Sequence, residues 1–267
     1  PETVTEFGAG AFYNCNQLVS VNVPEVVTNI GEGAFYNCQR LSSIKIPNGI
    51  ETIEPSTFYQ CFALRNAILP NSVTSIGNSS FRDCPRLDLV IPSGVTYIGM
   101  YAFRSSGIKE LNIPSGVTVI KDSSFMNCNE LTEIYLHDGI TNLENFAFAE
   151  CSKLKNVRLS NSLTEFSYFA FGRCVSLKTL DIPDSVTRLN YETFYGCSSL
   201  ELVRIGESLS SMESNVFRDC TSLTNVYFAG SAPQVESNTF ENIGFGPIAW
   251  VEAANADSFG GLNTFWN

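Results

Sequence analysis

Nine cysteines and a single histidine are the residues best suited to chemistry in this chain of 267 amino acids. Thiolates and imidazoles bind metal ions and act as nucleophiles, and cysteines also form disulfides. The cysteines are Cys15, Cys38, Cys61, Cys84, Cys128, Cys151, Cys174, Cys197 and Cys220. Successive cysteines lie 23 residues apart, except for one interval of 44. A disulfide framework has irregular spacings, whereas a fixed interval of this length indicates a repeat protein.

The spacing leaves three roles open for the thiols. They are small buried apolar groups that stay reduced, or they join neighbouring repeats as disulfides, or they bind a metal ion. Strands about 4.8 Å apart fall within the Cα separation of a disulfide, but side chains in identical phase point the same way rather than at each other. The chain has no Cys-x-x-Cys pair, which disfavours a metal site. We therefore expect buried, reduced thiols, with no metal ion and no cofactor.

Phenylalanine follows the same period, three residues before each cysteine position. The series is Phe12, Phe35, Phe58, Phe81, Phe103, Phe125, Phe148, Phe171, Phe194, Phe217 and Phe240. The repeat around Phe103 fills the long cysteine interval, and Ser106 takes the cysteine position there. This repeat and the one before it are each one residue short. The chain therefore contains about eleven repeats of 22–23 residues.

Each repeat approximates Ala-Phe-x-x-Cys-x-x-Leu-x-x-Val-x-Val-Pro-x-x-Val-Thr-x-Ile-Gly. Alternation in Val-x-Val predicts a strand with one buried face, which proline ends. Val-Thr-x-Ile predicts a second short extended piece. Ala-Phe-x-x-Cys is too short for a full helix and predicts a single helical or 3₁₀ turn. Because one repeat cannot bury its apolar face alone, we predict a strand-rich α/β solenoid of stacked repeats with the Phe, Leu and Cys positions in its core.

The repeats resemble the BspA-like leucine-rich repeat. The resemblance rests on Ala-Phe-Tyr-Asn-Cys-Gln-Arg-Leu-Ser-Ser-Ile-Lys-Ile-Pro (34–47) and Val-Thr-Ser-Ile-Gly (73–77), and it covers most of the chain. It implies a right-handed leucine-rich-repeat superhelix. It also implies a secreted, extracellular or cell-surface protein, bacterial or sometimes protist, that adheres to host or neighbouring-cell proteins.

The end of the sequence departs from the pattern. Position 243 is isoleucine instead of cysteine, and residues 253–259 predict a short helix. Both tryptophans, Trp250 and Trp266, lie in this stretch. A solenoid must shield its last core layer, and tryptophan covers a large area. We therefore predict a solenoid over residues 1–229, and a last partial repeat with a C-terminal cap over residues 230–267. Because Pro1 opens inside the repeat pattern, we expect the chain to be a trimmed fragment.

Composition argues against several classes of function. The net charge is −11, whereas a nucleic-acid-binding protein needs a basic surface, so we expect no nucleic-acid partner. No apolar run approaches the roughly 20 residues of a membrane helix, so we expect no membrane insertion. His137 stands where other repeats carry proline, and Asp138 beside it is in a turn position. We interpret His137 as a surface substitution and expect no catalytic residue and no enzymatic activity.

The exposed strand position varies between repeats and is the place to seek a partner. The row is Asn22, Lys45, Ile68, Val90, Asn112, Tyr135, Arg158, Asp181, Arg204 and Tyr227. Tyrosine and arginine are enriched at interface hot spots. We predict that the last five, Tyr135 to Tyr227, bind a protein ligand such as an extracellular-matrix or host surface protein, and that the protein is a monomer. An ordinary solvated sheet face is the alternative interpretation. The alternative function is a structural spacer of a larger surface protein.

Overall fold

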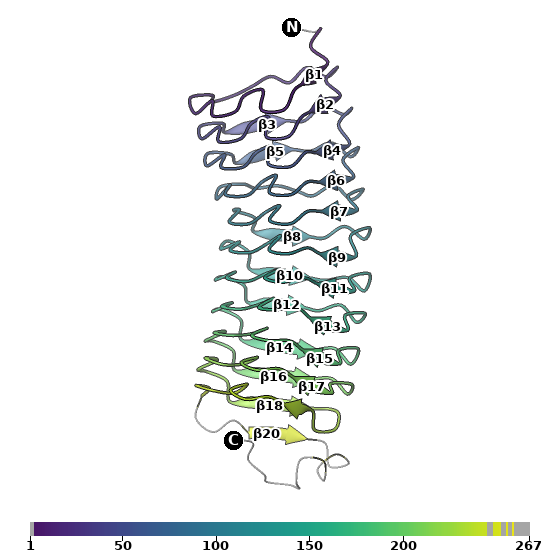
Figure 1. Ribbon diagram of the computed structural model, residues 1–267, viewed down its shortest axis with the longest axis vertical. Coiled ribbons are helices and arrows are strands. Elements are labelled where there is room, and N and C mark those ends of the chain that lie inside the picture. Colours follow the sequence, from purple (N-terminus) through teal and green to yellow (C-terminus); the bar gives the residue numbers. More distant parts are fainter. Residues whose placement is uncertain (1–2, 245–247, 252–254, 256–257, 259–267) are drawn as a thin grey trace. The chain divides into compact units, whose positions relative to one another are not determined.

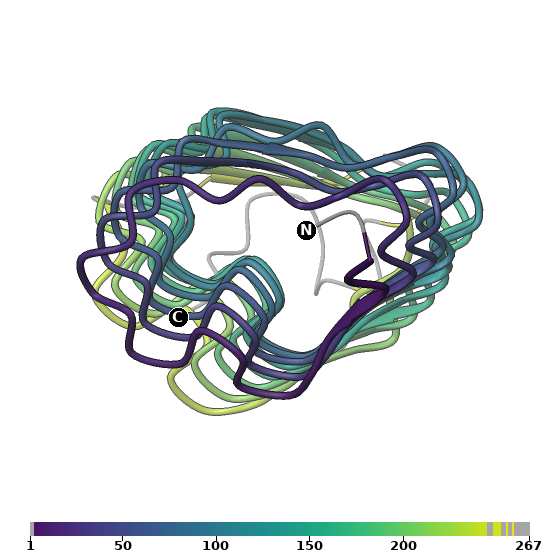
Figure 2. The same ribbon diagram turned by 90° about the horizontal axis from the view of Figure 1, so that it is seen from above.

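The computed structural model describes residues 3–244, 248–251, 255 and 258. The chain divides into two compact units, residues 1–131 and 132–267. Within each unit one repeat makes one turn of a parallel β-solenoid, with the longer strands in one column and the shorter strands in another (Figure 1). Viewed along the stacking direction, successive turns of a unit follow nearly the same closed path (Figure 2). The predicted repeat solenoid is confirmed.

From residue 3 onward, the first unit contains nine short strands. They are β1 (Glu6–Phe7), β2 (Asn29–Ile30), β3 (Ser43–Lys45), β4 (Thr52–Ile53), β5 (Asn66–Ile68), β6 (Ser75–Ile76), β7 (Tyr97–Ile98), β8 (Glu110–Asn112) and β9 (Val119–Ile120). Strand β1 pairs with β2, β3 pairs with β5, and β6 lies between β4 and β7, all in parallel. Each pair joins equivalent segments of adjacent repeats.

The second unit contains eleven strands among its described residues. They are β10 (Glu133–Tyr135), β11 (Asn142–Leu143), β12 (Asn156–Arg158), β13 (Glu165–Phe166), β14 (Thr179–Ile182), β15 (Arg188–Leu189), β16 (Leu202–Ile205), β17 (Ser211–Met212), β18 (Asn225–Phe228), β19 (Gln234–Val235) and β20 (Ile248–Val251). The longer strands pair as β10–β12 and β14–β16–β18–β20. The two-residue strands pair as β11–β13–β15–β17–β19. The apolar segment after Pro247 therefore adds one more strand to the sheet as β20.

The predicted alternation decides which side chains enter the core. In β3, β8 and β10 the central residue is buried and both neighbours are exposed. The same parity continues through the four-residue strand β14. Side chains of a strand alternate between faces, so each repeat contributes its apolar residues to one interior and its polar residues to one outer surface.

The phenylalanine series forms the centre of each unit. Phe35 and Phe194 are completely buried, as are Phe58, Phe171 and Phe217 of neighbouring repeats. Their rings stack nearly parallel, with centroids 5.5 Å apart for Phe35 and Phe58 and 5.5 Å apart for Phe194 and Phe217. A buried phenylalanine contributes roughly 1.5–3 kcal/mol through burial alone, and offset-stacked pairs add to this.

The prediction of a helical or 3₁₀ turn for Ala-Phe-x-x-Cys is wrong. Around Phe35 the backbone is left-handed at Gly33 (φ 59°) and at Asn37 (φ 55°), which breaks any helix into β-turns. The Tyr36 N–H donates to the Gly33 carbonyl at 2.9 Å, but the Phe35 N–H donates to the carbonyl of Thr57 in the next repeat, also at 2.9 Å. In a 3₁₀ helix both N–H groups would donate to carbonyls three residues earlier in the same segment. Alternate N–H groups instead bind successive repeats together.

The helix expected over residues 253–259 lies largely outside the described residues, as does Trp266. Asn255 and Ser258 are described, and both have 3₁₀ backbone. Elsewhere in the described chain the solenoid consists of strands and turns, so the α component of the expected α/β class is missing there. None of the described helical segments has the length and apolar character that crossing a membrane requires.

Candidate protein-binding surface

The five predicted contact residues lie on one exposed strand face of the second unit. Tyr135 in β10 stands opposite Arg158 in β12 in a parallel register. Asp181 in β14 stands opposite Arg204 in β16, which in turn stands opposite Tyr227 in β18. All five side chains are exposed, Tyr135 by 50% and Tyr227 by 39%. The structure therefore brings the whole predicted set together on one surface, and β12 and β14 are neighbours within it.

These side chains form two contacting groups along the row. The Arg158 guanidinium lies 4.7 Å from the centroid of the Tyr135 ring. The Arg204 guanidinium lies 3.1 Å from the Asp181 carboxylate and 5.9 Å from the Tyr227 ring. Exposed ion pairs and cation–π contacts contribute at most about 1 kcal/mol each. Their main effect is to hold long side chains in defined positions on the surface.

Trp250, which the sequence predicts only as part of the cap, extends the row by one position. It stands opposite Tyr227 in the register of β18 and β20. The two rings stack with centroids 5.8 Å apart and an interplanar angle of 11°. The Trp250 side chain is 47% exposed, and its indole N–H donates to Asn225 Oδ1 at 3.2 Å. A continued step of 23 residues from Tyr227 would have found it.

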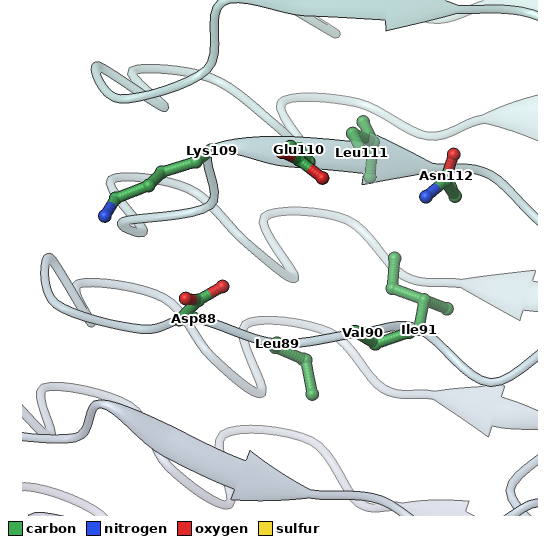
Figure 3. Close-up of a pocket in the computed structure, with 8 residues that line it drawn as sticks. All are labelled: Asp88, Leu89, Val90, Ile91, Lys109, Glu110, Leu111 and Asn112. Carbon is green, nitrogen blue, oxygen red and sulfur yellow. The ribbon is translucent and has the colours of Figure 1, made fainter.

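In the first unit the same row is less polar and carries a break in the sheet. Ile68 is 61% exposed and Val90 is 81% exposed. Residues 88–91 form only an isolated bridge, between Asp88 and Asn66. A shallow pocket of about 200 Å³ lies between residues 88–91 and β8 (Figure 3). It lies at the repeats that are one residue short. Its lining residues are Asp88, Leu89, Val90, Ile91, Lys109, Glu110, Leu111 and Asn112.

His137 has a structural role in its own turn. Its Nδ1 accepts a hydrogen bond from the Gly139 N–H at 3.0 Å, and its carbonyl accepts one from the Ile140 N–H. The Asp138 carboxylate accepts a hydrogen bond from the Asn161 N–H of the next repeat at 3.0 Å. Nδ1 is therefore occupied by a backbone donor, whereas in a catalytic triad this nitrogen is held by a carboxylate. These bonds support the interpretation of His137 as a surface substitution.

The expectation of buried thiols is confirmed for eight cysteines, which belong to the core, and is wrong for Cys15. All nine are free thiols, and all except Cys15 are buried. Each of several thiols donates to the carbonyl oxygen of the preceding repeat's phenylalanine, as from Cys61 Sγ to Phe35 O at 3.2 Å and from Cys197 Sγ to Phe171 O at 3.2 Å. Burial raises the pKa of both Cys61 and Cys197 to about 12. Within the described part of the chain, no three metal-binding side chains gather in one place.

Comparison with known proteins identifies the repeats. The BspA type leucine-rich repeat region matches residues 5–132 and 118–245, with six copies. A leucine-rich repeat protein from Bacteroides ovatus is 29% identical, with a TM-score of 0.80 over 94% of this chain and 67% of that one. A leucine-rich cell surface protein from Faecalibacterium prausnitzii is 28% identical, with a TM-score of 0.53 over 86% of this chain and 78% of that one.

The fold also extends to more distant proteins. The pneumococcal vaccine antigen PcpA is 20% identical, with a TM-score of 0.55 over 90% of this chain and 68% of that one. A search of curated proteins found no significant match. The repeat sequence, the parallel solenoid and the family match over residues 5–245 agree with one another. The chain belongs to the BspA-type leucine-rich-repeat family.

Proposed function

We propose that this protein is a non-catalytic binding module of the cell surface, which recognises a protein ligand on the exposed strand face of the second unit. The observation that carries the proposal is the row of exposed Tyr, Arg, Asp and Trp side chains there, which form two contacting groups, Tyr135–Arg158 and Asp181–Arg204–Tyr227–Trp250. Tyrosine, tryptophan and arginine are the residue types that most often dominate the binding energy of an interface.

The proposed mechanism of ligand recognition is preorganisation of the exposed side chains. Immobilising a long side chain during association costs roughly 0.5–1.5 kcal/mol. On this face Arg204 is already held by Asp181 on one side and by Tyr227 on the other. Tyr227 is held in turn by Trp250. A ligand therefore meets a surface on which much of this entropy has already been lost.

An extracellular location accompanies this function. The similar protein from Faecalibacterium prausnitzii is described as a cell surface protein. Eight of the nine free cysteines are compatible with that location because oxidants cannot reach buried thiols. We further propose that residues 230–267 contain the cap of the last repeat. This assignment is supported by the Asn255 amide, which donates to Ala229 O at 2.9 Å, and by Ser258 Oγ, which accepts from the Ala232 N–H at 3.0 Å.

The test is a Tyr135→Ala/Arg158→Ala/Tyr227→Ala variant in a binding screen against immobilised extracellular-matrix and serum proteins. We expect the wild-type protein to bind at least one of them. Loss of three hot-spot side chains should weaken that binding by about a hundredfold or more, since each costs roughly 2 kcal/mol. Circular dichroism should be unchanged, because all three side chains are exposed.

The matched control is Lys45→Ala/Ile68→Ala/Asn112→Ala, which truncates the same row of the first unit. This variant should retain wild-type affinity. Equal loss in both triple variants would contradict the assignment to the second unit. Failure of the wild-type protein to bind any member of the panel would favour the alternative, a structural spacer without a ligand of its own.

A further inference from the structure

A second row of tyrosine and arginine side chains lies on the β-turn edge of the first unit, away from the strand face. Five of its members come directly after the phenylalanine of their repeat. The sixth, Tyr101, stands two residues before Phe103, and its ring lies between the two arginines. We call it the turn-edge row. It consists of Tyr13, Tyr36, Tyr59, Arg82, Tyr101 and Arg104.

The row is continuous through direct contacts. The Tyr13 and Tyr36 rings stack with centroids 4.6 Å apart, and Tyr59 follows at 4.8 Å from Tyr36. The Arg82 guanidinium then lies 5.2 Å from the Tyr59 ring and 5.5 Å from the Tyr101 ring. These contacts join the side chains of five successive repeats. Tyr13 is 52% exposed, and Tyr36, Tyr59 and Arg82 are half-buried.

The two arginines at the end of the row have unused hydrogen-bonding capacity. Arg82 Nε is buried without a hydrogen-bond partner, and it lies 3.8 Å from the Asp83 carboxylate, which is beyond hydrogen-bonding distance. Arg104 lies 5.8 Å from the Tyr101 ring, and it forms no ion pair with any described residue. Aromatic faces hold a guanidinium by its plane, so its terminal Nη groups, unlike the buried Nε of Arg82, remain available for carboxylates.

In the second unit, an arginine at the position after phenylalanine forms an ion pair with a carboxylate of the next repeat. Arg218 also follows the phenylalanine of its repeat. Its guanidinium lies 3.2 Å from Glu241, which occupies the same position of the next repeat. The residue that follows Arg104 in this series is Met126, which has no charge. The turn-edge row therefore ends in two cations without a carboxylate at hydrogen-bonding distance, within a chain whose net charge is −11.

We propose that the turn-edge row is a second binding surface, which takes an acidic segment of a partner protein. Carboxylates of that segment bind Arg82 and Arg104 in the bidentate geometry that a guanidinium favours. Apolar side chains next to them pack against Tyr13, Tyr36 and Tyr59. Two arginines beside three tyrosines suit a short mixed segment. A long sulfated polysaccharide needs an extended basic surface, and the net negative charge of the chain repels it.

The experiment selects random dodecapeptides displayed on phage against the full 267-residue protein, and then measures the affinity of the enriched peptides by fluorescence anisotropy. We expect enrichment of Asp or Glu next to aromatic or aliphatic residues. An Arg82→Gln/Arg104→Gln variant should bind these peptides about tenfold more weakly or worse, since both charge-assisted contacts are lost. Raising the salt concentration should also weaken binding.

The control is Arg40→Gln/Arg65→Gln, which removes the same charge from exposed arginines outside the row. It should change the affinity by less than about twofold, as expected for distant surface charges. Enriched peptides without acidic residues, equal weakening in both double variants, or preferential binding of heparin would each overturn the proposal. The absence of any enriched peptide would do the same. The Tyr135→Ala/Arg158→Ala/Tyr227→Ala variant should keep full peptide affinity, so the two surfaces are tested independently.

Discussion

At the scale of single residues, the cysteine position completes the hydrogen bonding of the backbone inside the core. The Phe35 carbonyl accepts one hydrogen bond from the Cys38 N–H of its own turn and another from the Cys61 thiol of the next repeat, both at 3.2 Å. A buried carbonyl has two lone pairs to satisfy. Cysteine fills this small apolar space and supplies the second donor. Ser106, buried at the same repeat position, is the one hydroxyl in the series and lies 3.4 Å from Cys128 Sγ.

Thiol labelling should distinguish two classes of cysteine. In the native protein a maleimide should modify Cys15 rapidly and leave the other eight unmodified, because Cys15 is exposed and the rest are buried. Raised pKa values protect the buried groups further, since the reactive form is the thiolate. After unfolding in urea without reductant, mass spectrometry should count nine modified thiols. A smaller count would indicate disulfides, and fast native labelling of the others would contradict the buried series.

At the scale of elements, the β-turn edge shows how neighbouring repeats are joined. Alternate N–H groups of this segment point to the next repeat because two residues per turn adopt left-handed backbone. Gly33 occupies one of these positions, and other repeats place Phe146 or Glu150 in the same region of φ. An L-residue there costs roughly 1–2 kcal/mol. The inter-repeat hydrogen bonds and the packing of the Phe series offset this cost.

Replacing Gly33 by alanine should therefore destabilise the protein by about 1 kcal/mol. An added Cβ would meet only Tyr36 Cβ at 3.7 Å, so the effect isolates backbone conformation from steric clash. Gly8→Ala is the control, since an added Cβ has no neighbour within 4 Å and the backbone there is not left-handed. Urea unfolding should separate the two variants. Equal stability of both would mean that the left-handed conformation at position 33 is not costly.

The same elements explain what the sequence could and could not predict. The strands, the phenylalanine core and the exposed row from Tyr135 to Tyr227 follow from periods of two and 23 residues, which sequence displays directly. The turn edge does not follow from them. Its backbone depends on acceptors in the next repeat, and residues such as Phe146 in left-handed conformation carry no glycine or asparagine signal. Trp250 was missed because Ile243 interrupts the cysteine series just before it.

At the scale of the whole molecule, burial raises the pKa of seven thiols of the cysteine series, Cys38, Cys61, Cys84, Cys128, Cys174, Cys197 and Cys220. The apolar core favours the neutral thiol over the charged thiolate. Burial therefore raises the pKa of Cys61 from the ordinary value of 9.0 to about 12. In the unfolded chain the thiols release their protons near the ordinary value. The folded state therefore binds more protons than the unfolded state above that pH. Stability falls as pH rises wherever the folded state binds the extra protons.

We therefore expect the free energy of unfolding to be insensitive to these thiols below about pH 9 and to decline progressively between about pH 9 and 12. A Cys61→Ser/Cys197→Ser variant should show a shallower decline, because a serine hydroxyl does not titrate in this range. Urea unfolding at stepped pH values measures both slopes. Other titrating groups are shared by the two proteins and cancel in the comparison. Parallel slopes would contradict a thiol contribution.

The constant register between repeats has a genetic consequence. Every residue of β16 stands opposite its counterpart 23 positions earlier in β14 and 23 positions later in β18, so each interface is built from the same contacts. Where a repeat is one residue shorter, the Phe81 and Phe103 rings still stack at 5.5 Å. Duplication or loss of a 69-nucleotide segment therefore joins surfaces that already fit. Such events lengthen or shorten the exposed rows by single positions and leave the packing of the remaining core repeats as it was.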